Sequence, residues 1–189
     1  ESLIKACVAA KTNYLDITGE PAFVHRMYKL YHQPAMAAGI SVVNCCGFDS
    51  IPADLGAWLT AKALPVDQPK TIRAYIRTNA SFSGGTWTTA IHALYQRPQN
   101  RERLHSGPKH PDTPLLPLRI HFNKEQNRWA IPMPVVDPHI VKRSMHHVPH
   151  DYGVAVAYGQ FFTVPRLWDV VKIILPIAAI AIGVRIKLV

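Results

Sequence analysis

Two carboxylates and a hydroxyl follow an apolar run in the first third of the chain. Residues 40–46 are almost continuously apolar and bounded by glycines, which is typical of a strand covered on both faces. Asp49, Ser50 and Asp54 come directly after this run. Ligands of open α/β sheets bind in the crevice beyond the carboxyl ends of the strands, so we predict that Asp49 and Ser50 orient a substrate or donate a proton. The alternative is that all three residues only cap the following helix.

A second polar group follows the preceding β-like run, residues 14–18. Asp16 and Glu20 lie at the carboxyl end of this run and could line the same crevice as Asp49. The alternative is that both residues only form the turn into the helix that begins at Pro21.

A pair of glycines offers a third candidate site. Residues 71–78 alternate apolar and polar side chains, which predicts a half-exposed strand. Ser83, Gly84, Gly85 and Thr86 follow it and open a predicted helix. Their hydroxyls and backbone N–H groups could hold a substrate carbonyl or carboxylate. The alternative is a tight turn without a ligand.

The order of elements predicts how these residues are positioned. A helix at 2–10, a strand at 14–18, a helix from Pro21 to Gly39 and a strand at 40–46 are typical of a parallel α/β sheet. Pro34 should kink or divide the second helix. Alternating stretches at 118–122 and 154–162 indicate further antiparallel strands. We therefore predict a second, mixed α+β domain over residues 65–163.

The net charge of +9 is unevenly distributed. Residues 1–63 are neutral, whereas residues 97–150 carry nine basic side chains against four acidic ones. The segment 97–117 is rich in proline and has no apolar period, which predicts a long exposed loop. A basic loop could meet phosphate, an anionic membrane surface or nucleic acid, or it could be a solvated insertion. No nucleic-acid motif accompanies it, so we predict no nucleic-acid partner.

The C-terminal segment, residues 164–189, is predicted to form an apolar helix. Its uncharged run, residues 173–184, has twelve residues, which is short of the roughly 20 that a spanning helix requires. Trp168 and the flanking cations favour a segment that lies at a membrane surface. The alternative is a buried core helix.

Cysteines and histidines indicate neither a disulfide framework nor a metal site. Cys7, Cys45 and Cys46 are odd in number, which favours a reducing compartment, and the adjacent pair is more typical of packing than of redox chemistry. His146, His147 and His150 lack the spacing of a structural zinc site. We predict no bound metal and a cytoplasmic location.

Four segments resemble one known family. They are YLDITGEP at 14–21, YH at 31–32 ahead of AAG at 37–39, CGFDSIPADLG at 46–56 and SGGTW at 83–87. Together they are similar to the saccharopine dehydrogenase-like oxidoreductases, which include trans-acting enoyl reductases. The GFDSIPADLG segment is the most specific, and the matching blocks cover roughly the first half of the chain.

The resemblance implies a fold, a cofactor and a reaction. Residues 1–64 are expected to form the C-terminal part of a Rossmann-like NAD(P)-binding domain, joined to a mixed α+β substrate domain. Asp16, Glu20, Gly47 and Phe48 are the cofactor-binding residues it implies. The chain has no GxGxxG motif, so we expect an N-terminally truncated fragment that lacks the pyrophosphate loop and is inactive alone.

The expected reaction of the complete enzyme is NAD(P)H-dependent reduction of an enoyl or carbonyl group on a small, lipid-like or polyketide-derived substrate. The alternative is a non-catalytic protein of the same fold that associates with membrane or lipid. The family also implies peripheral association with a membrane or lipid droplet.

Overall fold

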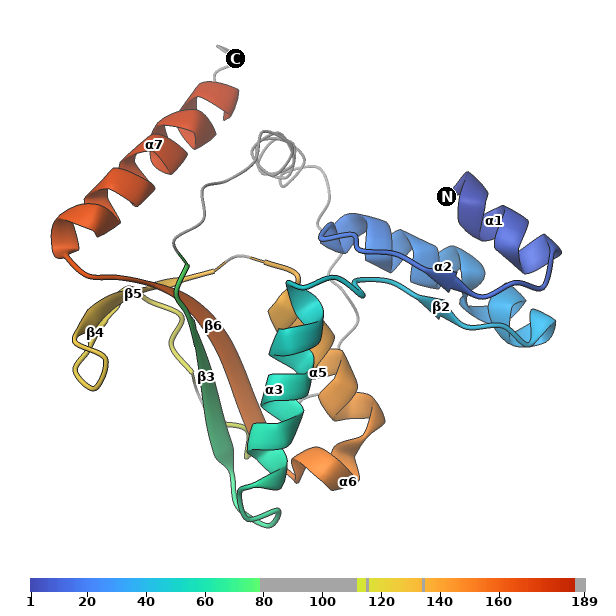
Figure 1. The fold of residues 1–189 in the computed structure, drawn as a ribbon, viewed down its shortest axis with the longest axis horizontal. Helices are drawn as coiled ribbons and strands as arrows, with labels where there is room; N and C mark the ends of the chain where they lie inside the picture. The colour runs from blue at the N-terminus through green and yellow to red at the C-terminus, as the bar shows by residue number, and fades with distance from the viewer. Residues whose placement is uncertain (79–111, 115, 134, 186–189) are drawn as a thin grey trace. The chain divides into compact units, whose positions relative to one another are not determined.

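The structure, a computed structural model, describes residues 1–78, 112–114, 116–133 and 135–185, except the side chains of residues 181, 184 and 185 (Figure 1). These residues belong to two compact units. Of the described residues, one unit contains 1–72, 112–114, 116 and 135–158, and the other contains 73–78, 117–133 and 159–185. Neither unit is one continuous stretch, and the predicted linear division at residues 64 and 163 stays a prediction.

The first unit begins with a helix and a β-α-β segment. Helix α1 is Ser2–Ala9, strand β1 is Tyr14–Leu15, helix α2 is Pro21–Ala38 and strand β2 is Val42–Val43. The two strands are parallel, with Tyr14 opposite Val42 and Leu15 opposite Val43. A parallel pair needs a crossover between its strands, and α2 supplies it. The predicted α/β fold class is therefore confirmed.

Proline and glycine mark the ends of α2 as the sequence predicts. Pro21 occupies the first turn, and Gly39 ends the helix in the left-handed conformation at φ 68°. Pro34 lies inside α2 and does not divide it. Of the two predicted effects of Pro34, the division into two helices is wrong, because the helix continues for another turn beyond the proline, and the kink stays a prediction.

The strand predicted at 40–46 is shorter and more exposed than expected. Val43 is 43% exposed and Leu15, its partner on β1, is 67% exposed. Successive side chains of a strand point to opposite faces of the sheet. One face of the β1–β2 pair is therefore directed toward α2, and no described residue covers the other face. The prediction that both faces are covered is wrong for this part of the chain.

Three further helices complete the first unit. They are α3, Ser50–Lys62; α5, Asp137–His147; and α6, Pro149–Tyr152. Asp54 of α3 accepts hydrogen bonds from the Ser144 hydroxyl of α5 at 2.8 Å and the Tyr152 hydroxyl of α6 at 3.4 Å. The Trp58 indole N–H of α3 donates to Asp151 Oδ2 of α6 at 2.7 Å. The sequence analysis did not predict α5 or α6.

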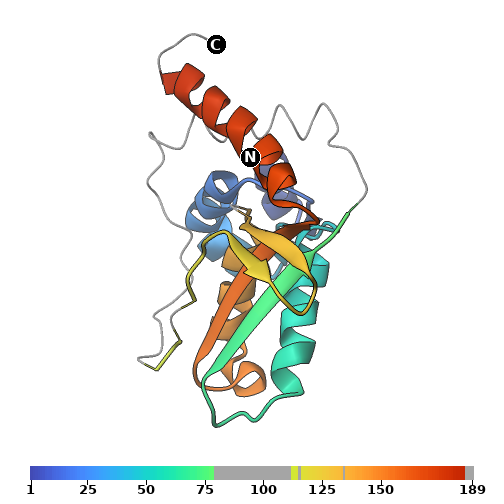
Figure 2. The same cartoon turned by 90° about the vertical axis from the view of Figure 1, so that its left-hand side faces the viewer.

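The second unit is built on a four-stranded sheet in the order β3-β6-β5-β4, whose strands appear in Figure 2. The strands are β3, Lys70–Ile76; β4, His121–Asn123; β5, Arg128–Pro132; and β6, Val156–Val164. Strand β5 is antiparallel to β4 and to β6. The predicted strands at 71–78, 118–122 and 154–162 correspond to β3, β4 and β6, whereas β5 was not predicted.

Helix α7, Leu167–Arg185, packs its first turns on this sheet. Val170 is buried against Ile131 of β5 and Val164 of β6, and Ile173 packs against the same cluster. Beyond Ile173, residues 174–179 are all exposed. The helix therefore has a buried beginning and an exposed apolar continuation. The buried-helix alternative holds for its first turns only, and a position of the rest at a membrane surface stays a prediction.

Candidate functional site

Asp16 holds together the loops that follow the two parallel strands. Its Oδ2 accepts hydrogen bonds from the Tyr14 hydroxyl at 3.0 Å and from Asn44 Nδ2 at 2.5 Å. Its Oδ1 accepts from the backbone N–H groups of Thr18 at 3.0 Å and Cys45 at 3.1 Å. A carboxylate has about four acceptor positions, so all are filled from within the chain. Asp16 thus positions both loops, and its direct contact with a cofactor stays a prediction.

The loop after β2 approaches the loop after β1 closely. The Cys46 N–H donates to the Asp16 carbonyl at 2.7 Å. A Cβ on Gly47 would lie 3.3 Å from Ile17 Cβ, tighter than most such contacts, which favours glycine at this position. Gly47 therefore serves the junction of the two loops, and its predicted contact with the cofactor stays a prediction.

Cys45 adopts an unusual backbone conformation at this junction, with φ 63°. Non-glycine residues rarely take positive φ values, and here the hydrogen bond to Asp16 helps to hold it. Burial, followed by the negative charges of Asp16 and Asp137, raises the pKa of the Cys45 thiol to about 12. A neutral, buried thiol is a poor nucleophile.

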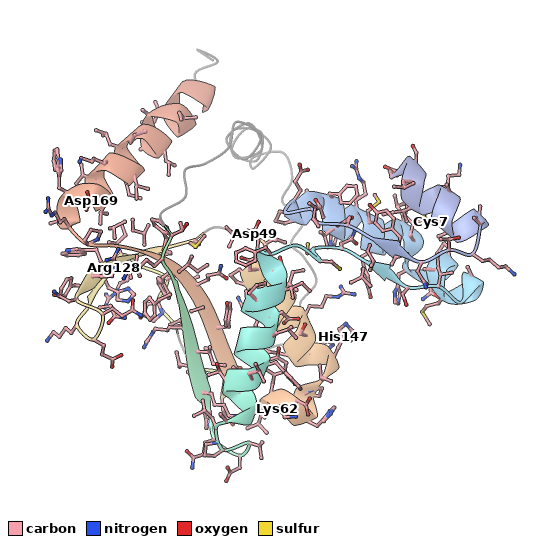
Figure 3. The ribbon with its side chains drawn as sticks, viewed as in Figure 1. Cys7, Asp49, Lys62, Arg128, His147 and Asp169 are labelled. Carbon is pink, nitrogen blue, oxygen red and sulfur yellow. The ribbon has the colours of Figure 1, made fainter. Side chains whose placement is uncertain are left out.

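Asp49 and Ser50 point to different surroundings. Ser50 is buried, and its hydroxyl donates to Asp137 Oδ1 of α5 at 2.8 Å. Asp49 precedes the first residue of α3 and is exposed, and its side chain makes no capping hydrogen bond (Figure 3). The capping alternative therefore fails for Asp49, whose carboxylate faces solvent, while Ser50 faces the interior of the unit. Their catalytic roles stay predictions.

Two of the predicted cofactor residues are exposed near the same loops. Phe48 is 90% exposed, and Glu20 is an exposed residue at the start of α2. An isolated aromatic ring left in water is available to stack on a flat ligand. Unlike Asp16, neither side chain is held by hydrogen bonds to the two loops, and the predicted contact of Phe48 and Glu20 with a cofactor stays a prediction.

Some predictions concern residues that the structure leaves undescribed. Ser83, Gly84, Gly85 and Thr86 lie outside the described residues, as does most of the loop predicted at 97–117. Within the described ranges, no three histidine, cysteine or acidic side chains are grouped so that they could hold a metal ion. None of the helices described there has both the length and the apolar character that crossing a membrane requires.

The partners of Asp16 and Ser50 were not predicted from the sequence. Asn44 interrupts the largely apolar run at 40–46 near its carboxyl end, and this polar residue was a usable signal for a contact at the strand end. Asp137 gave no such signal, because its hydrogen bond with Ser50 joins residues that are 87 positions apart in the sequence. A cavity of about 520 Å³ between α2, β2, α3 and α5 was also missed, since α5 was not predicted.

The parallel β-α-β segment and its joined loops define an α/β protein of the Rossmann-like kind. The chain is 29% identical to the saccharopine dehydrogenase-like oxidoreductase of Rattus norvegicus over 185 residues, which is 92% of this chain and 43% of that protein. It is 32% identical to the lipid droplet localized protein of Caenorhabditis elegans over 163 residues, 78% of this chain and 38% of that protein. It is 38% identical to a putative trans-acting enoyl reductase of Mycobacterium tuberculosis over 96 residues, 49% of this chain and 23% of that protein.

These similarities confirm the predicted resemblance. The chain is a relative of the saccharopine dehydrogenase-like oxidoreductases, and it spans less than half the length of the relatives it matches. No family model matches the chain. No solved structure matches it.

Proposed function

We propose that this chain belongs to an NAD(P)-dependent oxidoreductase that reduces an enoyl or carbonyl group on a lipid- or polyketide-derived substrate. The observation that carries the proposal is the junction at Asp16, which joins the loops after two parallel strands. Ligands of open α/β sheets bind at that edge. The similarity to an oxidoreductase family and to a putative enoyl reductase supports the reaction class.

The residues near this edge have distinct roles in the proposal. The nicotinamide cofactor supplies the hydride. Phe48 packs on a flat ring, and Asp49 orients the reacting group or donates the proton. Ser50 acts as a positioning residue, because its hydroxyl ties the start of α3 to Asp137 of α5 at 2.8 Å. Ser83 and Thr86, with Gly84 and Gly85, would hold the substrate carbonyl.

The test uses the product of the whole reading frame that contains this chain. NADPH and NADH are titrated separately by nicotinamide fluorescence, and NAD(P)H oxidation is then followed with a medium-chain enoyl thioester. We expect Phe48→Ala to weaken cofactor binding and Asp49→Asn to lower kcat more than it changes KM. Asp67→Asn makes the same chemical change at another exposed site and should alter neither value. Absence of cofactor binding at millimolar concentration contradicts the proposal.

A second candidate function is association with a lipid surface. Trp168, Val171, Leu175 and Ile182 of α7 recur at intervals of three, four and seven residues, and they are 64%, 37%, 66% and 58% exposed. An apolar stripe of this kind marks an interaction surface, and Lys172 beside it suits an anionic partner. One similar protein is named for its location on lipid droplets.

Flotation with anionic phospholipid vesicles tests this second function. We expect the unchanged chain to float and Leu175→Glu to reduce the floating fraction severalfold, because a carboxylate would enter the apolar layer. Leu30→Glu is the matched control, since Leu30 is also an exposed helical leucine, at 47%. Equal flotation of the two variants contradicts a role for α7.

A further inference from the structure

We propose that the cavity between α2 and α5 binds a small amphipathic anion, with its carboxylate or phosphate group at Arg143 and His147 and its apolar body between the helices. The cavity measures about 520 Å³, and residues of α2, β2, α3 and α5 line it. Small-molecule sites typically enclose about 300–1,000 Å³. All four elements belong to the first compact unit.

Arg143 provides the first part of the anion site. Its guanidinium carbon lies over the Tyr28 ring, 4.3 Å from the ring centre, in a cation–π contact. Among the described residues no carboxylate forms an ion pair with Arg143. Stacking on an aromatic face leaves the N–H edges of a guanidinium available, and these edges match a carboxylate or phosphate. The Arg143 side chain is therefore positioned for an oxyanion.

Histidines surround the same end of the cavity. His147, at the end of α5 (Figure 3), lines it together with His32 of α2, whose ring lies 4.6 Å from that of Tyr28. Partial desolvation, together with the positive charges of Arg143, His146 and His32, lowers the pKa of His147. These groups crowd positive charge onto one site, so a bound anion would relieve their mutual repulsion.

One carboxylate lines the cavity, and it is already engaged. Asp54 of α3 accepts the Ser144 hydroxyl at 2.8 Å and the Tyr152 hydroxyl at 3.4 Å. The oxygens of Asp54 are therefore engaged by hydroxyl groups of α5 and α6.

The remaining walls are suited to an apolar body. Val24, Met27 and Ala35 of α2 are buried, and Ile140 of α5 packs against the cluster that contains Val24. The ligand class that fits both parts is an alkyl or aryl chain that ends in one oxyanion.

This site differs from the one proposed for the reaction. Tyr28 lies near the middle of α2 and His32 in its second half, which leads into the amino end of β2, whereas Phe48 and Asp49 follow the carboxyl end of β2. Ser50 lines the cavity, so the two sites adjoin each other, but neither Phe48 nor Asp49 lines it. The inference goes beyond the proposed reductase function and can fail or hold independently of it.

Calorimetric titration of the 189-residue chain tests the site. The probes are octyl phosphate, octanoate, octyl glucoside and inorganic phosphate, each below micelle-forming concentration. We expect the two alkyl anions to bind more tightly than the neutral glucoside and than inorganic phosphate. Arg143→Gln should weaken octyl phosphate binding by about tenfold, the effect of losing a charged hydrogen-bond donor. Arg26→Gln removes the same charge from an exposed position outside the cavity and should change nothing.

A second variant keeps the test decisive if Arg143→Gln does not fold. His147 is exposed, so His147→Gln should leave the fold intact. Octyl sulfate, which keeps a single negative charge at both pH values, should bind the unchanged chain more tightly at about pH 5.5 than at about pH 7.5, because protonated histidines add positive charge. His147→Gln should reduce that pH dependence. Equal binding of the glucoside and the anions, or unchanged binding in both variants, overturns the proposal.

Discussion

Asp16 is the residue on which the junction of the two parallel strands depends. Replacing it with alanine leaves the Tyr14 hydroxyl, the Asn44 amide and two backbone N–H groups without their acceptor. We expect Asp16→Ala to lower the free energy of unfolding by about 2–4 kcal/mol, because hydrogen bonds to charged groups contribute about 1.5–3 kcal/mol each and water replaces some of them. Urea unfolding measures the loss. Asp67→Ala, at an exposed site, should change stability little, and equal stability of the two variants would contradict this role for Asp16.

The buried thiol of Cys45 makes the free energy of unfolding depend on pH in the alkaline range. Its pKa rises from an ordinary 9.0 to about 12 on folding, with burial as the main cause. As pH rises, the unfolded chain therefore releases the thiol proton at a lower pH than the folded chain does. The stability that the buried thiol contributes is present in full below about pH 9 and is lost as pH rises from there toward 12. The free energy of unfolding should fall over this window in the unchanged chain and fall less in Cys45→Ala.

Burial also raises the pKa values of Tyr152 and Tyr158, so part of the alkaline loss will remain in the cysteine variant. Thiol labelling separates the contributions. In the native chain near neutral pH, Cys7 and Cys46, which are half-buried, should react well before Cys45. Fast native-state labelling of Cys45 would be inconsistent with a buried thiol of raised pKa.

At the scale of elements, Pro34 is a weak point of α2. A proline nitrogen carries no hydrogen, so the carbonyl of Leu30 loses its intrahelical partner, and the ring crowds the preceding turn. Pro34 is exposed, so an alanine there meets no packing restraint. We expect Pro34→Ala to raise the free energy of unfolding by about 1–3 kcal/mol, up to the full difference in helix propensity. Thermal unfolding tests this, with Gln33→Ala as the control, and a less stable Pro34→Ala variant would refute it.

Elements with local signals could be predicted from the sequence, and those fixed by distant contacts could not. Pro21 and Gly39 mark the ends of α2 through their own backbone preferences. Helix α5 begins at Asp137 with a largely polar sequence, and the contact of its Ser144 with Asp54 spans 90 residues. The apolar periodicity of α5 does not indicate that Asp54 is a partner of Ser144.

The candidate site divides in the same way. The positions of Asp16 and Asp49 beyond strand ends were predictable, because a strand followed by a turn places its next residues at the sheet edge. The sequence does not show that four donors occupy the Asp16 carboxylate. Two of these donors belong to Asn44 and Cys45, which lie 28 and 29 residues further along the chain. The inward orientation of Ser50 likewise depends on Asp137.

At the scale of the whole molecule, net charge and the exposed helix α7 should act together on an anionic surface. The chain carries +9. Attraction between this charge and anionic lipid is screened by salt, with a Debye length that falls from about 10 Å at 0.1 M to about 3 Å at 1 M. Burial of the apolar stripe of α7, by contrast, does not depend on this screening. We therefore expect vesicle binding to fall with added salt to a remaining salt-resistant fraction.

Two controls assign these contributions. Leu175→Glu should remove the salt-resistant fraction, because it places a carboxylate on the stripe at a position that is 66% exposed. Uncharged vesicles should remove the salt-dependent fraction and leave the contribution of α7. Flotation across a salt series measures both fractions. Binding that persists in Leu175→Glu at high salt would mean that another surface of the chain, rather than α7, enters the lipid.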